Sequence, residues 1–251
     1  MTAEVFSPYQ RPPVSKDPPS PDNDVNVSLT ALVARAEGTG LPPKTIEQIL
    51  GVAHYKGEDF SIAVKDGADH LLIVPGNGAE VEENWYLNVA GVAVNRGLGA
   101  TVLDMSGLPY VANVWERAIH HAINKNGGPE KTILMGHSSG AMAAMNVAEL
   151  RSPKGLVLVA PHATGLGIDA EYQSGLFDRS PNYKAIRQRV GNLVVVCSDN
   201  DPYIPPDETE AIASGLNVKP WVIPNSGHFT SIYLPNFPEV LDSILANPEK
   251  S

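Results

Sequence analysis

The sequence lacks the features that mark several classes of protein. It holds one cysteine, Cys197, in 251 residues, which excludes a disulfide framework and a cysteine zinc site. Because Cys197 follows an apolar run at residues 193–196, we expect a small buried core residue there rather than a reactive thiol. No apolar run approaches the roughly 18 residues that span a bilayer, and prolines and charges occupy the N-terminal segment where a signal peptide needs an apolar stretch. We therefore expect a soluble cytoplasmic protein without a membrane partner.

Positive charge is scarce as well. Lys and Arg number 18 against 28 Asp and Glu, so the formal net charge is −10, and the basic residues form no cluster. Nucleic-acid binding depends on clustered basic side chains that displace counterions from phosphates. The sequence therefore predicts no nucleic-acid partner. Its hydrophobic content of 43% is ordinary for a globular protein, and 251 residues are enough to bury one large core.

The N-terminal part of the chain differs in composition from the rest. Residues 1–26 are rich in Pro, Ser and Asp and offer too little apolar surface to offset the entropy of ordering them, so we expect a flexible proline-rich tail. Residues 27–57 are predicted to form a helical extension, with helices at 28–35 and 44–54. Their apolar residues recur at helical spacing and need a surface to cover. That surface is either the main domain or a second copy of the chain, and we favour the homo-oligomer.

Residues 58–251 alternate between short apolar runs and longer helical patterns. Apolar runs without polar alternation are typical of strands buried on both faces of a mostly parallel sheet, and the alternation predicts an α/β fold with helices on both faces. The expected strands are 60–64, 70–74, 100–105, 132–135, 155–160, 193–197 and 221–223. The expected helices are 82–96, 113–124, 139–150, 183–190, 208–214 and 237–245. The first two strands, joined through Asp66 and Gly67, are predicted to form an antiparallel hairpin at the sheet edge.

One predicted strand runs directly into the pattern G-x-S-x-G, Gly136-His137-Ser138-Ser139-Gly140, and a helix of small residues follows. In this context the pattern is typical of a nucleophile elbow, a sharp turn that presents a serine hydroxyl. The serine backbone is strained at such a turn, and a side chain at either glycine would collide with the neighbouring helix or strand. Ser138 is therefore the predicted nucleophile.

A serine hydroxyl is a useful nucleophile only when a neighbouring base takes its proton and an acid orients that base. In α/β-hydrolases the acid and then the histidine follow the serine along the chain. Asp199 and Asp201 follow one predicted strand and His228 follows the next, and sites form at the carboxyl ends of strands in such sheets. His228 is the predicted base. These residues alone do not distinguish Asp201 from Asp199, which could equally cap the turn.

A tetrahedral oxyanion needs hydrogen-bond donors. One is expected to be the backbone N–H of Ser139, and the other to come from the early loop that contains Gly76, Asn77 and Gly78. We predict the Asn77 N–H as the loop donor, with Gly76 and Gly78 as structural neighbours that let the backbone approach the substrate. The rival interpretation, a phosphate-binding loop, is disfavoured because the Lys-Ser/Thr ending of a P-loop is absent.

Together these segments resemble the retinoblastoma-binding-protein-nine-like serine hydrolases, in the same order and at similar spacing over about residues 69–246. The matching stretches are Val74-Pro75-Gly76-Asn77-Gly78, Trp85-Tyr86, Gly136-His137-Ser138-Ser139-Gly140-Ala141, Ser174-Gly175-Leu176-Phe177, Asp201-Pro202-Tyr203-Ile204-Pro205 and Gly227-His228-Phe229. The resemblance implies an α/β-hydrolase fold with a minimal lid, Asp201 as the acid, and residues 162–179 as a short connection flanking the pocket. The compact members of that family lack roughly the first 66 residues.

The leading hypothesis is a carboxylesterase-like serine hydrolase that cleaves a small ester, thioester or amide through a Ser138 acyl-enzyme, without a metal or an organic cofactor. A second hypothesis assigns the serine and histidine to acyl transfer, cyclisation or lyase chemistry on the same fold. A third is a binding or regulatory protein with a vestigial triad, against which the intact Ser138, Asp201 and His228 count. Because fold does not fix substrate, the sequence predicts a small-molecule acyl substrate without specifying its acyl or leaving group.

Overall fold

The structure is a computed structural model, and it describes residues 60–62, 67–234 and 236–246. The predicted tail (1–26) and helical extension (27–57) lie outside the described residues. The described elements are, in chain order, β1 (Phe60–Ile62), β2 (His70–Val74), α3 (Tyr86–Asn95), β3 (Gly99–Val102), α4 (Ala112–Lys125), the 3-10 helix η1 (Pro129–Lys131), β4 (Thr132–His137), α5 (Ser139–Ala148), β5 (Gly155–Val159), α6 (Asp169–Ser174), α7 (Tyr183–Arg189), β6 (Asn192–Ser198), α8 (Pro206–Leu216), β7 (Trp221–Ile223) and α9 (Phe237–Leu245).

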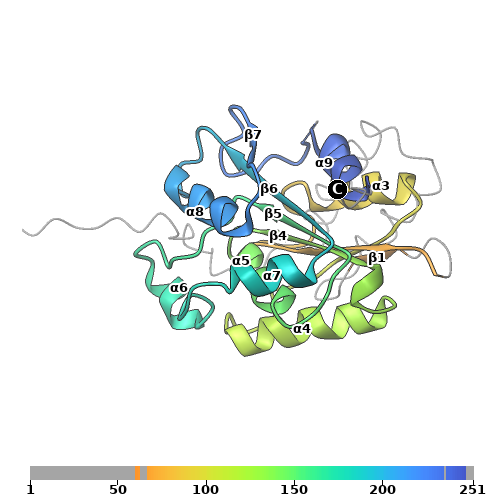
Figure 1. Cartoon of the computed structure of the whole chain (residues 1–251), viewed down its shortest axis with the longest axis horizontal. Coiled ribbons are helices and arrows are strands. Elements are labelled where there is room, and N and C mark those ends of the chain that lie inside the picture. Colours follow the sequence, from red (N-terminus) through yellow and green to blue (C-terminus); the bar gives the residue numbers. More distant parts are fainter. Residues whose placement is uncertain (1–59, 63–66, 235, 247–251) are drawn as a thin grey trace, which may run out of the picture.

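A seven-stranded sheet runs through the centre of the molecule in the order β1-β3-β2-β4-β5-β6-β7 (Figure 1). From β3 to β7 in this order, neighbouring strands are parallel, and within the sheet only the edge strand β1 is antiparallel to its neighbour. Helices connect the parallel strands, as α3 connects β2 to β3 and α5 connects β4 to β5. The predicted α/β architecture with a mostly parallel sheet is confirmed.

The predicted hairpin between residues 60–64 and 70–74 is wrong. β1 is antiparallel and lies at the sheet edge, as expected, but it pairs with β3, where Phe60 lies opposite Val102. β2 has β3 along one edge and β4 along the other, so neither of its edges is free for β1. A turn signal in a sequence marks where a strand ends, but it does not say which strand becomes the neighbour.

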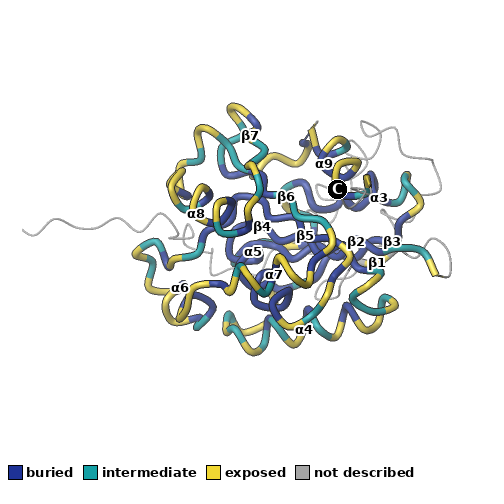
Figure 2. The backbone as a smooth tube through the Cα atoms, viewed as in Figure 1, coloured by how far each residue is buried: buried dark blue, intermediate teal, exposed yellow. Residues whose placement is uncertain are grey.

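Alternate residues of the central strands pack on opposite faces of the sheet. In β2, Leu71 and Ile73 belong to the core of one face, and Leu72 and Val74 to the core of the other. Residues of α3 and α9 complete the first core, and residues of α4, α5, α7 and α8 complete the second. Figure 1 shows α3 and α9 on one side of the sheet and α4, α5 and α7 on the other, and the central strands are buried (Figure 2). Burial on both faces explains the continuous apolar runs of the sequence.

Two helices differ most from the expectation. α3 begins at Tyr86 instead of residue 82, because Asn84 has a φ of 53° and a left-handed residue does not continue a right-handed helix. α6 has no predicted counterpart, since its 6 residues are too few to show a helical period. It lies within residues 162–179, the connection that the resemblance places beside the pocket. None of the helices in the described ranges combines the length and apolar character needed to cross a membrane.

His70, the first residue of β2, is a buried titratable group in the sheet. The residue is 7% exposed, its Nε2 lies 2.8 Å from Thr101 Oγ1, and a Cβ on Gly99 would come within 2.3 Å of its Nδ1. Burial lowers the pKa of His70 from 6.5 to about 4. Between these two pH values the unfolded chain binds the proton more readily than the folded chain does, so the free energy of unfolding falls as the pH falls.

We expect His70→Gln to weaken this acid destabilisation, because glutamine keeps a hydrogen-bonding group near Thr101 but does not titrate. Between pH 6.5 and 4 the wild type should lose about 1–2 kcal/mol more of its free energy of unfolding than the variant, after allowance for solvent screening. Urea denaturation at half-unit pH intervals measures the difference. His121→Gln, at an exposed position on α4, is the control and should follow the wild type. Identical pH slopes for wild type and His70→Gln would contradict this role of His70.

Candidate active site

Ser138 lies at the turn between β4 and α5, and its backbone has φ 55° and ψ −125°. A non-glycine residue held at positive φ costs on the order of 1–3 kcal/mol, so the surroundings must hold the turn in place. Both flanking glycines are needed for close packing. A Cβ on Gly136 would lie 2.5 Å from the Cα of Ala141, and one on Gly140 would lie 2.3 Å from the carbonyl oxygen of Pro75. The steric reason inferred from the G-x-S-x-G pattern therefore agrees with the geometry.

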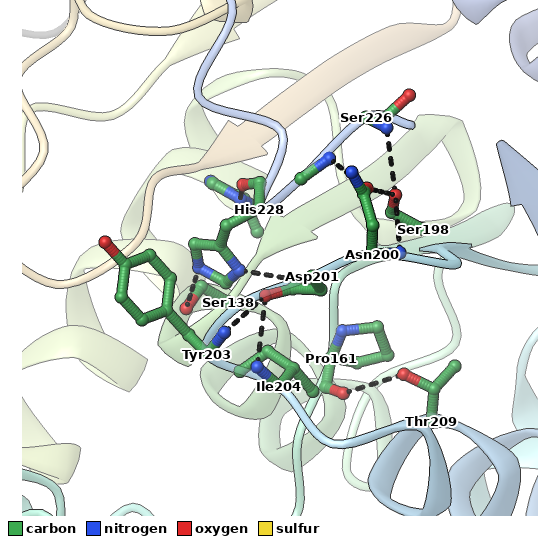
Figure 3. Close-up of polar contacts among 12 residues, drawn as sticks. Ser138, Pro161, Ser198, Asn200, Asp201, Tyr203, Ile204, Thr209, Ser226 and His228 are labelled. Carbon is green, nitrogen blue, oxygen red and sulfur yellow. Dashed lines mark hydrogen bonds and ion pairs between the residues drawn. The ribbon is translucent and has the colours of Figure 1, made fainter. Parts of the chain in front are cut away.

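Ser138, His228 and Asp201 form a hydrogen-bonded chain (Figure 3). His228 Nε2 lies 3.0 Å from Ser138 Oγ, and His228 Nδ1 lies 2.8 Å from Asp201 Oδ2. The side chains of His228 and Asp201 are 7% and 5% exposed, and Ser138 is 5% exposed. The structure thus brings together three predicted residues that come from the carboxyl ends of β4, β6 and β7.

The hydrogen bonds of Asp201 fix the tautomer of His228. Because an ionised carboxylate only accepts, Nδ1 of His228 carries the proton, and the lone pair of Nε2 faces the Ser138 hydroxyl. The other carboxylate oxygen of Asp201 accepts from the N–H groups of Tyr203 and Ile204 at 2.9 and 3.0 Å. Burial by itself would raise the pKa of Asp201, but the hydrogen bond and charge of His228 and these two N–H groups outweigh it and hold the pKa below its ordinary value. Asp201 is therefore an anion near neutral pH.

The three residues before Asp201 bind the loop that carries His228, and Figure 3 shows one of these contacts, between Ser198 and Ser226. Three backbone N–H groups of that loop donate to their side chains: Asn225 to Asp199 Oδ1 at 2.7 Å, Ser226 to Ser198 Oγ at 3.0 Å and Gly227 to Asn200 Oδ1 at 2.8 Å. Of the two aspartates that the sequence left open, Asp201 contacts the imidazole and Asp199 caps the neighbouring backbone, a geometry that favours Asp201 as the acid. Each residue of the run 198–201 therefore binds one residue of the run 225–228. Sequence reasoning did not foresee this pairing of the two loops.

The loop after β2 is packed against the turn at Ser138. A Cβ on Gly76 would lie 3.3 Å from the Cβ of Ser138, and the N–H of Gly76 donates to the hydroxyl of Tyr86 at 3.2 Å. The N–H of Ala79 donates to the carbonyl of Gly76 at 3.2 Å, and Gly78 has a φ of 75°, so residues 76–79 form a β-turn with Gly78 at its left-handed position. Gly76 and Gly78 thus shape the turn. The turn hydrogen bond does not involve the N–H of Asn77.

Ser139, the other predicted donor, is the first residue of α5. The first N–H groups of a helix have no acceptor within the helix, and the helix dipole favours negative charge there. Its side chain is also engaged: Ser139 Oγ donates to Glu171 Oε1 at 2.9 Å, and the hydroxyl of Tyr110 donates to Glu171 Oε2. Glu171 is 3% exposed and belongs to α6, so the connection 162–179 contacts the site directly. No motif in the sequence indicated Glu171.

Cys197 is more exposed than expected. It lies between buried and exposed, because β6 is buried only at its centre, Val195 and Val196. Burial is the main cause that raises the pKa of its thiol, and the carboxylates of Asp201 and two further acidic residues raise it further.

Two cavities lie near β6. Cys197 and Asp201 line one of about 290 Å³, and neither Ser138 nor His228 belongs to its wall. A second cavity, of about 500 Å³, lies near the start of β6 and includes none of the predicted site residues.

Solved structures with the same architecture identify the class of fold. The ydeN gene product of B. subtilis is 20% identical, with a TM-score of 0.64, over 71% of this chain and 100% of that one. Est1E from Butyrivibrio proteoclasticus is 16% identical, with a TM-score of 0.59, over 74% of this chain and 90% of that one. At these identities the likeness establishes the fold alone, which is the α/β-hydrolase fold.

Sequence comparison then gives the family. Residues 71–234 match the family model described as serine hydrolase. The chain is also 31% identical to serine hydrolase RBBP9 of Rattus norvegicus over 179 residues. The aligned region covers 69% of this chain and 94% of that protein. The chain belongs to this family of serine hydrolases, and the resemblance inferred from the motifs is confirmed.

The close packing of Gly140 leads to a stability prediction. Gly140→Ala should lower the free energy of unfolding by about 2 kcal/mol or more, because the added Cβ would meet the carbonyl oxygens of Pro75 and Val74 at 2.3 and 2.5 Å. Chemical denaturation measures the loss. Gly107→Ala is the matched control, since a Cβ there meets nothing within 4 Å, and it should stay within about 0.5 kcal/mol of the wild type. The packing argument fails if both variants unfold at the same denaturant concentration.

Proposed function

We propose that the protein hydrolyses a small ester, thioester or amide through an acyl-enzyme on Ser138, as a carboxylesterase-type enzyme. The observation that carries the proposal is the hydrogen-bonded chain from Ser138 Oγ through the His228 ring to Asp201. Membership of the serine hydrolase family supports the general class of activity. The substrate class and the acyl-enzyme are the proposed part.

In the first half-reaction Ser138 Oγ attacks the carbonyl carbon of the substrate, and His228 Nε2 takes the hydroxyl proton. The imidazolium that forms faces Asp201, whose lowered pKa keeps a negative charge next to it. The tetrahedral intermediate then collapses, the bond to the leaving group breaks, and the leaving group receives the proton from His228. The acyl group remains on Ser138.

The oxyanion of this intermediate would be held by two backbone donors. The N–H of Ser139 lies at the start of α5, where the helix dipole adds to the hydrogen bond. The N–H of Asn77 is the donor that the turn at residues 76–79 leaves free, while the N–H of Gly76 is engaged by Tyr86. We therefore assign Asn77 as the donor and Gly76 and Gly78 as the residues that shape the loop.

In the second half-reaction a water molecule replaces the leaving group. His228 takes a proton from the water as the water oxygen attacks the acyl carbon. His228 then gives this proton to Ser138 Oγ as the carboxylic acid leaves. Each step uses only groups of this chain and water. Because Ser138 and His228 are only 5% and 7% exposed, the approach to the reacting atoms is narrow, which favours a small acyl group.

The nucleophile is tested by labelling with a fluorophosphonate probe and by hydrolysis of p-nitrophenyl esters of graded chain length. We expect labelling at Ser138, and a loss of both labelling and turnover of about 10³-fold or more in Ser138→Ala. Ser152→Ala, at an exposed position, is the control and should behave as the wild type. Labelling of another residue, together with an active Ser138→Ala, would remove the proposal.

The identity of the acid is tested by two amide substitutions. Asp201→Asn should lower kcat by about 10²-fold or more, because the amide can donate to His228 Nδ1 and stabilise the wrong tautomer. Asp199→Asn should stay within about threefold of the wild type, because its amide oxygen still accepts from the N–H of Asn225. Steady-state kinetics of the two variants decide the question, and equal losses or the reverse order would mean that Asp201 is not the acid.

A further inference from the structure

Tyr86 and His137 form a polar pair beneath the site that the reaction described above does not use. Tyr86 lies in the first turn of α3 and is fully buried, and His137 is the last residue of β4, immediately before Ser138, and is 2% exposed. The hydroxyl of Tyr86 lies 2.8 Å from His137 Nδ1. The two rings pack edge to face with their centroids 5.8 Å apart. A polar pair this deeply buried is costly unless all its hydrogen bonds are made.

The pair makes hydrogen bonds to two other parts of the site. On one side the N–H of Gly76, in the loop after β2, donates to the Tyr86 hydroxyl at 3.2 Å, and the amide of Asn84 donates to it at 3.3 Å. On the other side His137 Nε2 lies 3.0 Å from the backbone carbonyl oxygen of His228. One continuous chain of hydrogen bonds therefore runs from the oxyanion loop, behind Ser138, to the main chain of the base.

The chemistry of the partners fixes the direction of every bond in this chain. The carbonyl of His228 can only accept, so His137 Nε2 must carry a proton. Burial lowers the pKa of His137 to about 3, so the ring is neutral and its Nδ1 has a lone pair. Burial also raises the pKa of Tyr86 to about 12, so its hydroxyl is protonated and donates to that lone pair. The oxygen of Tyr86 is then left to accept from Gly76 and Asn84.

From this arrangement we infer that Tyr86 and His137 are positioning residues, which hold the oxyanion loop at Gly76 and the main chain of His228 at fixed places relative to Ser138. The inference rests on the proposed function. The two held segments follow β2 and β7, which are separated in the sheet by β4, β5 and β6, so β-sheet pairing alone does not tie them to each other. His137 can connect them because it is the residue next to the nucleophile, on the strand between them.

Packing does not by itself require these polar atoms. Trp85 contacts Tyr86, His137 and Phe237 with ring-centroid distances of 4.9, 5.7 and 4.7 Å, so the volume around the pair is already filled by aromatic rings. A phenylalanine at position 86 would occupy nearly the same space. The hydroxyl therefore contributes directed hydrogen bonds and not bulk, and its removal should alter the placement of the loop more than the packing of the core.

The first test compares Tyr86→Phe with the wild type in the hydrolysis of p-nitrophenyl acetate. We expect kcat to fall about 10- to 100-fold with KM changed by less than about threefold, since the loss of a buried partner misplaces groups that act in the transition state. Tyr183→Phe, a half-buried tyrosine at the start of α7 on the other face of the sheet, is the matched control and should keep the kcat of the wild type. An unchanged kcat in Tyr86→Phe would overturn the inference.

Two substitutions of His137 separate the two ends of the chain of hydrogen bonds. His137→Gln can still donate toward the carbonyl of His228 but lacks the acceptor for Tyr86, and His137→Asn does the reverse. Both should lower kcat about tenfold or more. If the chain of hydrogen bonds acts only while it is continuous, His137→Gln already breaks it, so adding Tyr86→Phe to that variant should cost clearly less than Tyr86→Phe costs in the wild type. Additive losses in the double variant would show that the two residues act separately and would overturn the inference.

A third readout does not depend on turnover. In ¹⁵N NMR spectra of the wild type at pH 7, the ring of His137 should be the neutral tautomer with the proton on Nε2, and Tyr86→Phe should shift the Nδ1 resonance. The opposite tautomer would overturn the inference. A wild type that neither hydrolyses esters nor reacts with a fluorophosphonate would instead contradict the proposed function. The two failures are therefore distinguishable.

Discussion

The backbone turn at Ser138 is the constraint on which the rest of the site depends. Ser138 has a φ of 55°. Two contacts hold it in this conformation: the hydrogen bond from its N–H to the carbonyl of Val159 at 2.9 Å, and the tight approach of Gly140 to the carbonyl of Pro75. These contacts come from β5 and from the loop after β2. The strands β5 and β2 lie on either side of β4. The strain, on the order of 1–3 kcal/mol, is tolerated because β4 lies in the middle of a sheet that is covered on both faces.

The loops around this turn hold one another in place. The side chains of residues 198–200 bind the backbone of residues 225–227, and Asp201 binds the ring of His228 itself. Tyr86 and His137 join the loop after β2 to the main chain of His228 from below. Loops are usually the most variable and mobile parts of a fold. In this protein hydrogen bonds between two loops orient His228, which explains how its imidazole ring keeps one position.

Burial and hydrogen bonding together set the protonation state of each group. His137 is neutral because desolvation lowers its pKa to about 3, so it adds no positive charge next to His228, whose ring centroid is 5.1 Å away. The side chain of Asp201 is also largely enclosed, yet the bonds from His228, Tyr203 and Ile204 keep it ionised. The site therefore combines one oriented anion with a neutral neighbour on the other side of the imidazole, an arrangement that suits a base which becomes cationic during the proposed reaction.

The sequence by itself determined the mostly parallel sheet, because strands buried on both faces must be continuously apolar, and it determined the serine turn, because only glycine fits at positions 136 and 140. It also supplied His228, through its place after the last strand. The resemblance to a known family already implied Asp201, and the tertiary structure added its contact with His228 and the different role of Asp199. The partner of β1 and the contacts of Glu171 and of the pair Tyr86 and His137 came only from the tertiary structure. The physical reason is that periodicity and turn residues report local burial and backbone shape, whereas strand order and side-chain partners depend on which distant segments pack together.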